Sequence, residues 1–191
     1  MVKIEHIRQV NDGHNWKCGA VCLEMIFNFY GIPCNQDDIW EKIKSKRNDG
    51  IEQYYSHTVD LAKYSVNKGL KAYICKAKPN CVEIVLSLID TDKRPVIMSI
   101  LEKKSQNSHF VIYTGKKNGR FYFTDPNRDK TFSYYTLSEV EDFWKPRPEI
   151  DVAGYIFVAF DNYDLELYKD YLEFVVDLYK DEMVWPNNNH L

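Results

Sequence analysis

The sequence predicts an α+β fold in which a helical N-terminal half packs on an antiparallel β-sheet. Up to Arg94-Pro95 most apolar residues recur at helical spacing, whereas beyond this point they alternate with polar residues as in strands. Two alternating stretches flank Lys117-Asn118-Gly119, which is a strong hairpin signal. Helices followed by strands are typical of α+β domains.

The N-terminal half begins with Ile4–Val10, which we expect to form a short strand or an extended arm, followed by a turn at Asn11-Asp12-Gly13. A first helix is predicted over Cys18–Tyr30, because Gly31 is a good helix stop and Pro33 follows it. A second helix is predicted after the cap residue Asn35 and contains Ile39, Trp40 and Ile43. A third helix is predicted over Thr58–Asn67, and a strand over Leu70–Cys75. A fourth helix is predicted to start with a capping box of Asn80 and Glu83 and to run through Ile89.

The C-terminal half contains most of the predicted sheet. Its strands are Val96–Leu101, His109–Thr114, Arg120–Thr124 and Ala153–Phe160, with a short helix over Ser138–Trp144. The segment Tyr163–Met183 is predicted to be an acidic amphipathic helix that packs on the sheet or docks a protein partner; we favour packing.

Size and composition predict one domain over residues 1–191, with a core at 1–160 and a C-terminal helical extension at 161–191. The net charge of −3 is spread without a basic stripe, so no nucleic-acid partner is expected. No 18 consecutive apolar residues occur, so no membrane span is expected. Five cysteines without a repeated spacing indicate a reducing compartment, hence the cytoplasm, although export without a signal peptide would leave no trace.

Three residues at predicted element boundaries carry the chemistry of a cysteine nucleophile. Cys18 lies at a helix start, where unpaired amides and the helix dipole stabilise a thiolate. His109 begins one strand of the predicted hairpin and Asp125 ends its partner, so both lie at the same edge of the sheet. We therefore expect His109 to activate the thiol and Asp125 to orient the imidazole. The side-chain amide of Gln9 and the backbone amide of Cys18 are candidates for holding an oxyanion.

Alternatives exist for several of these residues. His14 is a rival base, and Trp16 either lines the cleft or anchors its loop. Cys18 and Cys22 lie four residues apart and would be two metal ligands, but no second pair has matching spacing. We therefore expect no metal and no cofactor, with Cys22 facing the core.

The string from Gln9 through Cys18-Gly19-Ala20-Val21-Cys22 to Tyr30-Gly31, together with Ser108-His109-Phe110 and Asp125-Pro126, resembles papain-like cysteine peptidases of the bacteriocin-leader (double-glycine) type. Lys17 stands where that family often has an acidic residue. The resemblance implies a papain-like fold and hydrolysis of a peptide or isopeptide bond in a polypeptide through a thioester. It implies Cys18 as nucleophile, His109 as general base and acid, Asp125 as orienting carboxylate and Gln9 as oxyanion donor.

Two other functions remain open from the sequence. A thiol acyltransferase or deamidase would use the same thioester and differ only in what resolves it. A non-enzymatic interaction protein would use its aromatic surface or the segment from Tyr163 as its contact.

Overall fold

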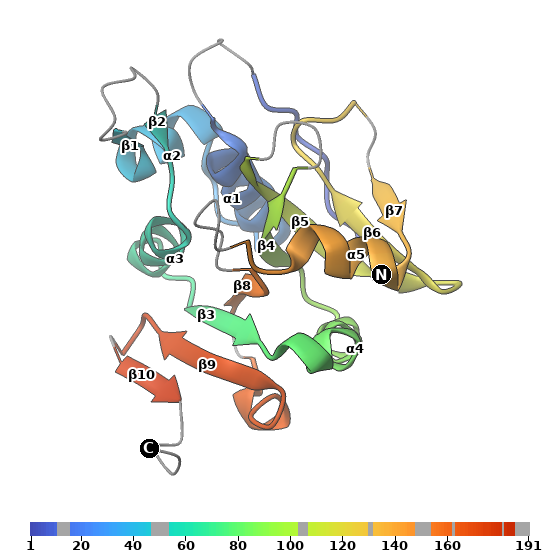
Figure 1. Cartoon of the computed structure of the whole chain (residues 1–191). Helices are drawn as coiled ribbons and strands as arrows, with labels where there is room; N and C mark the ends of the chain where they lie inside the picture. The colour runs from blue at the N-terminus through green and yellow to red at the C-terminus, as the bar shows by residue number, and fades with distance from the viewer. Residues whose placement is uncertain are drawn as a thin grey trace.

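The computed structural model describes residues 1–10, 16–46, 54–102, 107–129, 132–147, 154–161, 163–180 and 182–185. An eight-stranded antiparallel sheet runs through the molecule in the order β10-β9-β3-β8-β4-β5-β6-β7 (Figure 1). Its strands are β3 (Ala72–Ala77), β4 (Val96–Leu101), β5 (Ser108–Lys117), β6 (Arg120–Thr124), β7 (Ser133–Tyr135), β8 (Ile156–Phe160), β9 (Leu172–Asp177) and β10 (Glu182–Trp185). A separate two-stranded sheet joins β1 (Ser45–Lys46) to β2 (Tyr54–Tyr55).

Helices cover both faces of the large sheet. The helices are α1 (Cys18–Phe29), α2 (Gln36–Ile43), α3 (Thr58–Asn67), α4 (Val82–Asp92) and α5 (Leu137–Trp144), with short 3-10 turns η1 (Pro79–Cys81) and η3 (Leu165–Leu167). Alternate residues of each strand face opposite cores: Ile97 and Ile112 pack with α1, α2 and α3, whereas Met98 and Val111 pack with α4 and α5. The predicted packing of a helical N-terminal half on an antiparallel sheet is therefore confirmed.

The first helix ends as its sequence predicts. Gly31 adopts a left-handed φ of 71°, which glycine reaches without a Cβ penalty. The amide of Gly31 donates to the carbonyl of Asn28 (3.1 Å), and the amide of Ile32 donates to that of Phe27 (2.8 Å). This Schellman arrangement satisfies two carbonyls at the end of α1.

The predicted hairpin between β5 and β6 is also confirmed. Asn118 and Gly119 both have positive φ, at 49° and 72°, as a two-residue type I′ turn requires. The register pairs Ile112 with Thr124. His109 near the start of β5 and Asp125 just after β6 therefore lie at the same edge of the sheet.

The predicted helix over Tyr163–Met183, and with it the helical extension at 161–191, is wrong where the structure describes this segment. It contains η3, β9 and β10 instead. Leu172, Val175 and Asp177 are buried whereas Glu173 is exposed, a spacing of three and then two residues that fits neither a regular strand nor a helix alone. β9 pairs with β3, whose backbone groups would otherwise lie unpaired at a sheet edge, so tertiary pairing overrides the local helical pattern. The described part of this segment therefore contains no amphipathic α-helix that could dock a partner.

Smaller differences occur at other element boundaries. The strand predicted over Leu70–Cys75 begins at Ala72, because the amide of Leu70 closes the end of α3 on the carbonyl of Ser65. The capping box predicted at Asn80 is absent, since Pro79 starts a 3-10 turn through Cys81 and α4 begins after it without a side-chain cap.

The N-terminal segment and the chain's hydropathy complete the fold. Residues 1–10 form an extended arm rather than a strand, and the predicted turn at Asn11-Asp12-Gly13 lies outside the described residues. Among the described helices, none combines the length and the apolar character that a membrane crossing demands.

Candidate active site

Cys18 is the first residue of α1 and is 6% exposed. The first intrahelical bond of α1 runs from the amide of Val21 to the carbonyl of Lys17 (3.0 Å). The amides of residues 18 to 20 therefore precede the hydrogen-bonded ladder and direct partial positive charge at the sulfur. The helix α1 packs against β5, the strand that carries His109.

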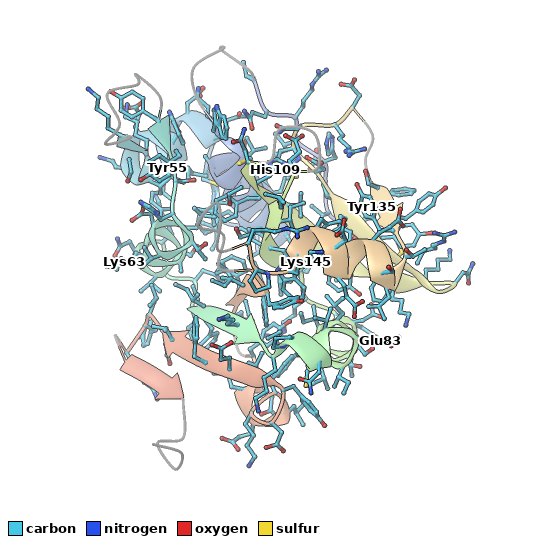
Figure 2. The ribbon with its side chains drawn as sticks, viewed as in Figure 1. Tyr55, Lys63, Glu83, His109, Tyr135 and Lys145 are labelled. Atoms are coloured by element: carbon cyan, nitrogen blue, oxygen red, sulfur yellow. The ribbon has the colours of Figure 1, made fainter. Side chains whose placement is uncertain are left out.

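The structure brings Cys18, His109 and Asp125 together. The Nε2 of His109 lies 2.8 Å from Oδ1 of Asp125, and the imidazole also forms a side-chain hydrogen bond with Cys18. His109 is 4% exposed and lies at the junction of α1 with β5 (Figure 2). The ring therefore links the thiol to the carboxylate.

The imidazole of His109 is held in a charge-favouring environment. Burial alone would lower its pKa, but the charge and hydrogen bonds of Cys18 and Asp125 outweigh burial and raise the pKa of His109 to about 10. The imidazolium form is therefore favoured when Cys18 carries a negative charge. A thiolate–imidazolium pair is the reactive form of a cysteine nucleophile.

Asp125 is surrounded by hydrogen-bond donors. Its Oδ1 also accepts from the amide of Asn127 (2.9 Å), and its Oδ2 accepts from Nε of Arg128 (3.1 Å). Burial would raise the pKa of Asp125, but the His109 imidazole, the Asn127 amide and the Arg128 guanidinium together hold it below its ordinary value. Asp125 is therefore a carboxylate at neutral pH.

The N-terminal arm brings Gln9 to the loop that carries Asp125. The amide of Gln9 donates to the carbonyl of Pro126 (2.8 Å), and Nε2 of His6 lies 3.1 Å from the carbonyl oxygen of Asp125. The backbone of the predicted oxyanion donor is thus bound to the loop that carries Asp125. Trp16 is half-buried, and both interpretations of it stay open. The rival base His14 lies outside the described residues.

Three other cysteines lie in environments that favour the neutral thiol. Burial raises the pKa of Cys22, Cys34 and Cys75. Cys22 faces the core as predicted, and its thiol donates to the carbonyl of Phe110 (3.4 Å). Among the described residues, no three His, Cys, Asp or Glu side chains form a metal-binding group.

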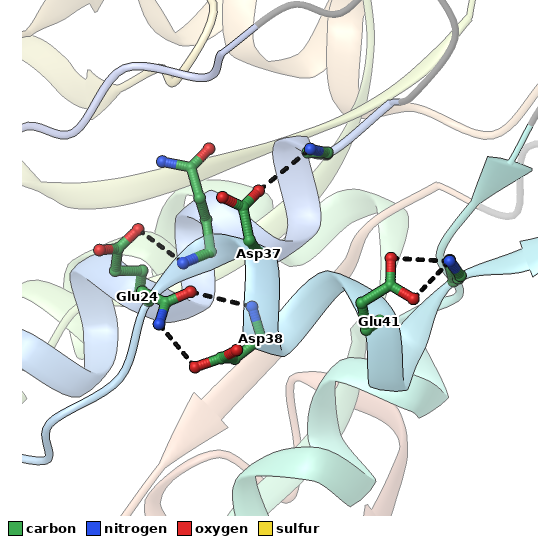
Figure 3. Close-up of polar contacts among 8 residues, drawn as sticks. Glu24, Asp37, Asp38 and Glu41 are labelled. Atoms are coloured by element: carbon green, nitrogen blue, oxygen red, sulfur yellow. Dashed lines mark hydrogen bonds and ion pairs between the residues drawn. The ribbon is translucent and has the colours of Figure 1, made fainter.

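Polar contacts join α2 to α1 and to Lys17, the residue before the nucleophile (Figure 3). The ammonium of Lys17 lies 3.1 Å from Oδ1 of Asp37, and the amide of Gln36 donates to Oε2 of Glu24 (3.0 Å). Lys17, which departs from the pattern of the resembling family, is thus directed to α2 by an ion pair.

Sequence reasoning missed three residues around the site. Arg128 follows Asp125 by three residues, and this short spacing in the sequence could have predicted the ion pair between them. The contacts of His6 with Asp125 and of Ser56 with Gly19 join residues far apart in the chain, and nothing in the local sequence indicates them.

Solved structures with the same fold include a protease and a peptidase domain. A double-glycine motif protease from an AMS/PCAT transporter, in complex with the leader peptide, has a TM-score of 0.56 and 21% identity, covering 83% of this chain and 91% of that one. The peptidase domain of Streptococcus ComA, a bi-functional ABC transporter of a quorum-sensing pathway, has a TM-score of 0.62 and 15% identity, covering 85% of this chain and all of that one. The fold is therefore that of the papain-like peptidases.

The class of the protein follows from a family match over most of the chain. Residues 1–149 match the Peptidase_C39 like family. The protein is a cysteine peptidase, and it belongs to the Peptidase_C39 like family. No curated protein sequence matches the chain.

Proposed function

We propose that the protein hydrolyses a peptide or isopeptide bond in a polypeptide, with Cys18 as nucleophile, His109 as general base and acid, and Asp125 as the orienting carboxylate. The proposal is supported by the contact between Nε2 of His109 and Oδ1 of Asp125 at 2.8 Å. The same imidazole forms a side-chain hydrogen bond with Cys18. This order of thiol, imidazole and carboxylate is the arrangement on which cysteine nucleophiles of several folds depend.

The first half of the reaction forms a thioester. The sulfur of Cys18 bonds to the scissile carbonyl carbon while His109 holds the thiol proton. The developing oxyanion is stabilised by the backbone amide of Cys18 and the side-chain amide of Gln9. The tetrahedral intermediate collapses with cleavage of the carbon–nitrogen bond, and His109 gives its proton to the departing amine.

The second half releases the acid. Water adds to the thioester carbonyl and gives a proton to His109, the carbon–sulfur bond breaks, and the proton returns to the sulfur of Cys18. Asp125 keeps its charge throughout and stabilises the imidazolium in both halves.

A polypeptide substrate is supported by a relative. The double-glycine motif protease with the same fold was solved with a leader peptide bound to it. We extend only the chemical class, a polypeptide, to this chain. A cytoplasmic location is part of the same proposal and is supported by five cysteines that are all free.

A panel of vinyl-sulfone-capped peptides tests the proposal. Intact-mass analysis is expected to show one adduct on the wild-type chain, located at Cys18, and none on Cys18→Ala. Cys34→Ala, which removes a half-buried thiol elsewhere, is the matched control and is expected to react like wild type. An adduct on Cys18→Ala, or none on wild type with any peptide, would contradict the assignment.

A further inference from the structure

Both oxygens of the Asp125 carboxylate accept hydrogen bonds. Its Oδ1 faces His109 and the amide of Asn127, whereas its Oδ2 accepts a hydrogen bond from Nε of Arg128 at 3.1 Å. The Asp125 side chain is only 11% exposed, and that of Arg128 is 56% exposed. An arginine at the protein surface therefore reaches an almost buried charge in the site.

The hydrogen bond from Arg128 determines the orientation of the plane of the Asp125 carboxylate. The terminal torsion of an aspartate is broad, so its own preference leaves the carboxylate plane poorly defined. A donor on Oδ1 alone allows the plane to rotate about that contact. A second donor on Oδ2 fixes the plane, and an ionised donor and acceptor make this bond stronger than a neutral one.

The backbone of the same loop is held separately. The carbonyl of Asp125 lies within 3.1 Å of Nε2 of His6 and accepts the amide of Arg128 at 3.2 Å, and the carbonyl of Pro126 accepts the amide of Gln9 at 2.8 Å. None of these bonds involves the guanidinium. Removal of the Arg128 side chain is therefore expected to leave the loop in place and to free only the carboxylate.

We infer that Arg128 is a positioning residue for the proposed reaction: it fixes the Asp125 carboxylate, which in turn fixes the ring of His109 toward Cys18. This inference rests on the proposed function, since it needs Cys18 to be the nucleophile. The competing explanation is an exposed ion pair of the kind that often contributes nothing measurable. The two differ in whether the effect of Arg128 passes through Asp125.

A double-mutant cycle makes that distinction. The measured quantity is the rate at which iodoacetamide alkylates Cys18 near neutral pH, followed by mass spectrometry, so no substrate is needed. Arg128→Gln is expected to lower this rate roughly three- to tenfold in the wild-type background and less than about twofold in the Asp125→Asn background, because contacting residues that act together are not additive. Arg128→Lys keeps the charge without the planar fork and is expected to recover part of the rate.

The matched control removes an arginine from the strand that leads to Asp125. Arg120 lies at the start of β6, is exposed, and its guanidinium lies over the ring of Tyr134. Arg120→Gln is expected to leave the rate within about twofold of wild type. Equal losses for Arg128→Gln in both backgrounds, or a wild-type rate for Arg128→Gln, would overturn the inference.

The same measurement separates failure of the inference from failure of the proposed function. If Cys18 of the wild-type chain reacts no faster than the other cysteines, the proposed nucleophile is wrong and the role of Arg128 falls with it. If Cys18 reacts first but the cycle shows no coupling, only the role of Arg128 is wrong. Thermal unfolding of each variant shows whether a lower alkylation rate of Cys18 results from loss of the folded structure.

Discussion

Ser56 packs against the position of Gly19 beside the nucleophile and leaves no room for a side chain at residue 19. A Cβ there would lie 2.6 Å from Oγ of Ser56, 3.1 Å from Cδ1 of Leu61 and 3.2 Å from Cδ2 of Phe110. The Ser56 hydroxyl is buried and has no hydrogen-bond partner in the described structure. The start of α1 therefore packs so closely against Ser56, Leu61 and Phe110 that a side chain at residue 19 requires these neighbours to move.

Gly19→Ala is accordingly expected to destabilise the protein by about 1–3 kcal/mol, the usual cost of overpacking, and to slow alkylation of Cys18. Urea unfolding and the alkylation rate check both effects. Ser56→Ala removes the closest contact and should restore part of the loss in the double variant. Asn28→Ala, an exposed site on the same helix, should stay within about 0.5 kcal/mol of wild type. A fully stable Gly19→Ala would contradict the contact.

Cys18 is expected to be the first of the five cysteines to react with a thiol alkylator near neutral pH. It alone pairs with His109, whereas burial raises the pKa of Cys22, Cys34 and Cys75. Peptide mapping after brief labelling gives the order. Cys81, a partly exposed thiol outside the site, is the internal reference, and equal labelling of both would count against an activated nucleophile.

The pH dependence of stability should report the charged imidazole. The pKa of His109 is raised from 6.5 to about 10 in the folded protein, because Cys18 and Asp125 outweigh burial. A raised folded pKa contributes stability that is fully present below pH 6.5 and is lost as the pH rises through about 10. Urea unfolding at pH 6, 8 and 10 should therefore show a larger decrease for wild type than for His109→Gln.

The same experiment has an internal check. The other titrating groups are shared by the two proteins, so the difference between the wild-type and His109→Gln curves reports the imidazole together with its interactions with Cys18 and Asp125. Cys18→Ala removes the larger of the two charged partners and should give an intermediate curve. Parallel wild-type and His109→Gln curves across this range would show that the imidazolium is not specifically stabilised.

Val175→Ala is expected to cost roughly 1–2 kcal/mol, because the Val175 side chain on β9 is fully buried in the core on the α4 and α5 side of the sheet. Glu173→Ala on the same strand removes an exposed side chain that pairs with Lys76 and should cost less than about 1 kcal/mol. Thermal unfolding of the two variants compares them. Equal small effects would be inconsistent with β9 as an integral strand.

Local signals predicted the part of the fold that positions the site. The Gly31 stop defines the end of α1, and Asn118-Gly119 defines the hairpin that brings His109 and Asp125 to one edge. Each of these rests on residues adjacent in the chain. The proximity of Cys18, His109 and Asp125 was predictable because all three residues lie at element boundaries.

The parts that sequence could not predict depend on distant partners. The segment of β9 contains apolar residues compatible with either period, and its pairing partner β3 lies about a hundred residues earlier. Ser56 against Gly19 is likewise a contact between different elements. Arg128 is different, because its positive charge three residues after Asp125 in the sequence could have predicted the ion pair.

The position of β3 between β8 and β9 has a consequence for biosynthesis. Residues 72–77 leave the ribosome long before residues 156–160 and 172–177, so both flanks of this strand stay open in the nascent chain. Pairings over such long separations slow folding. The sheet that carries the imidazole lacks β9 until residue 177 has emerged, so we expect peptidase chemistry only after β9 has paired with β3.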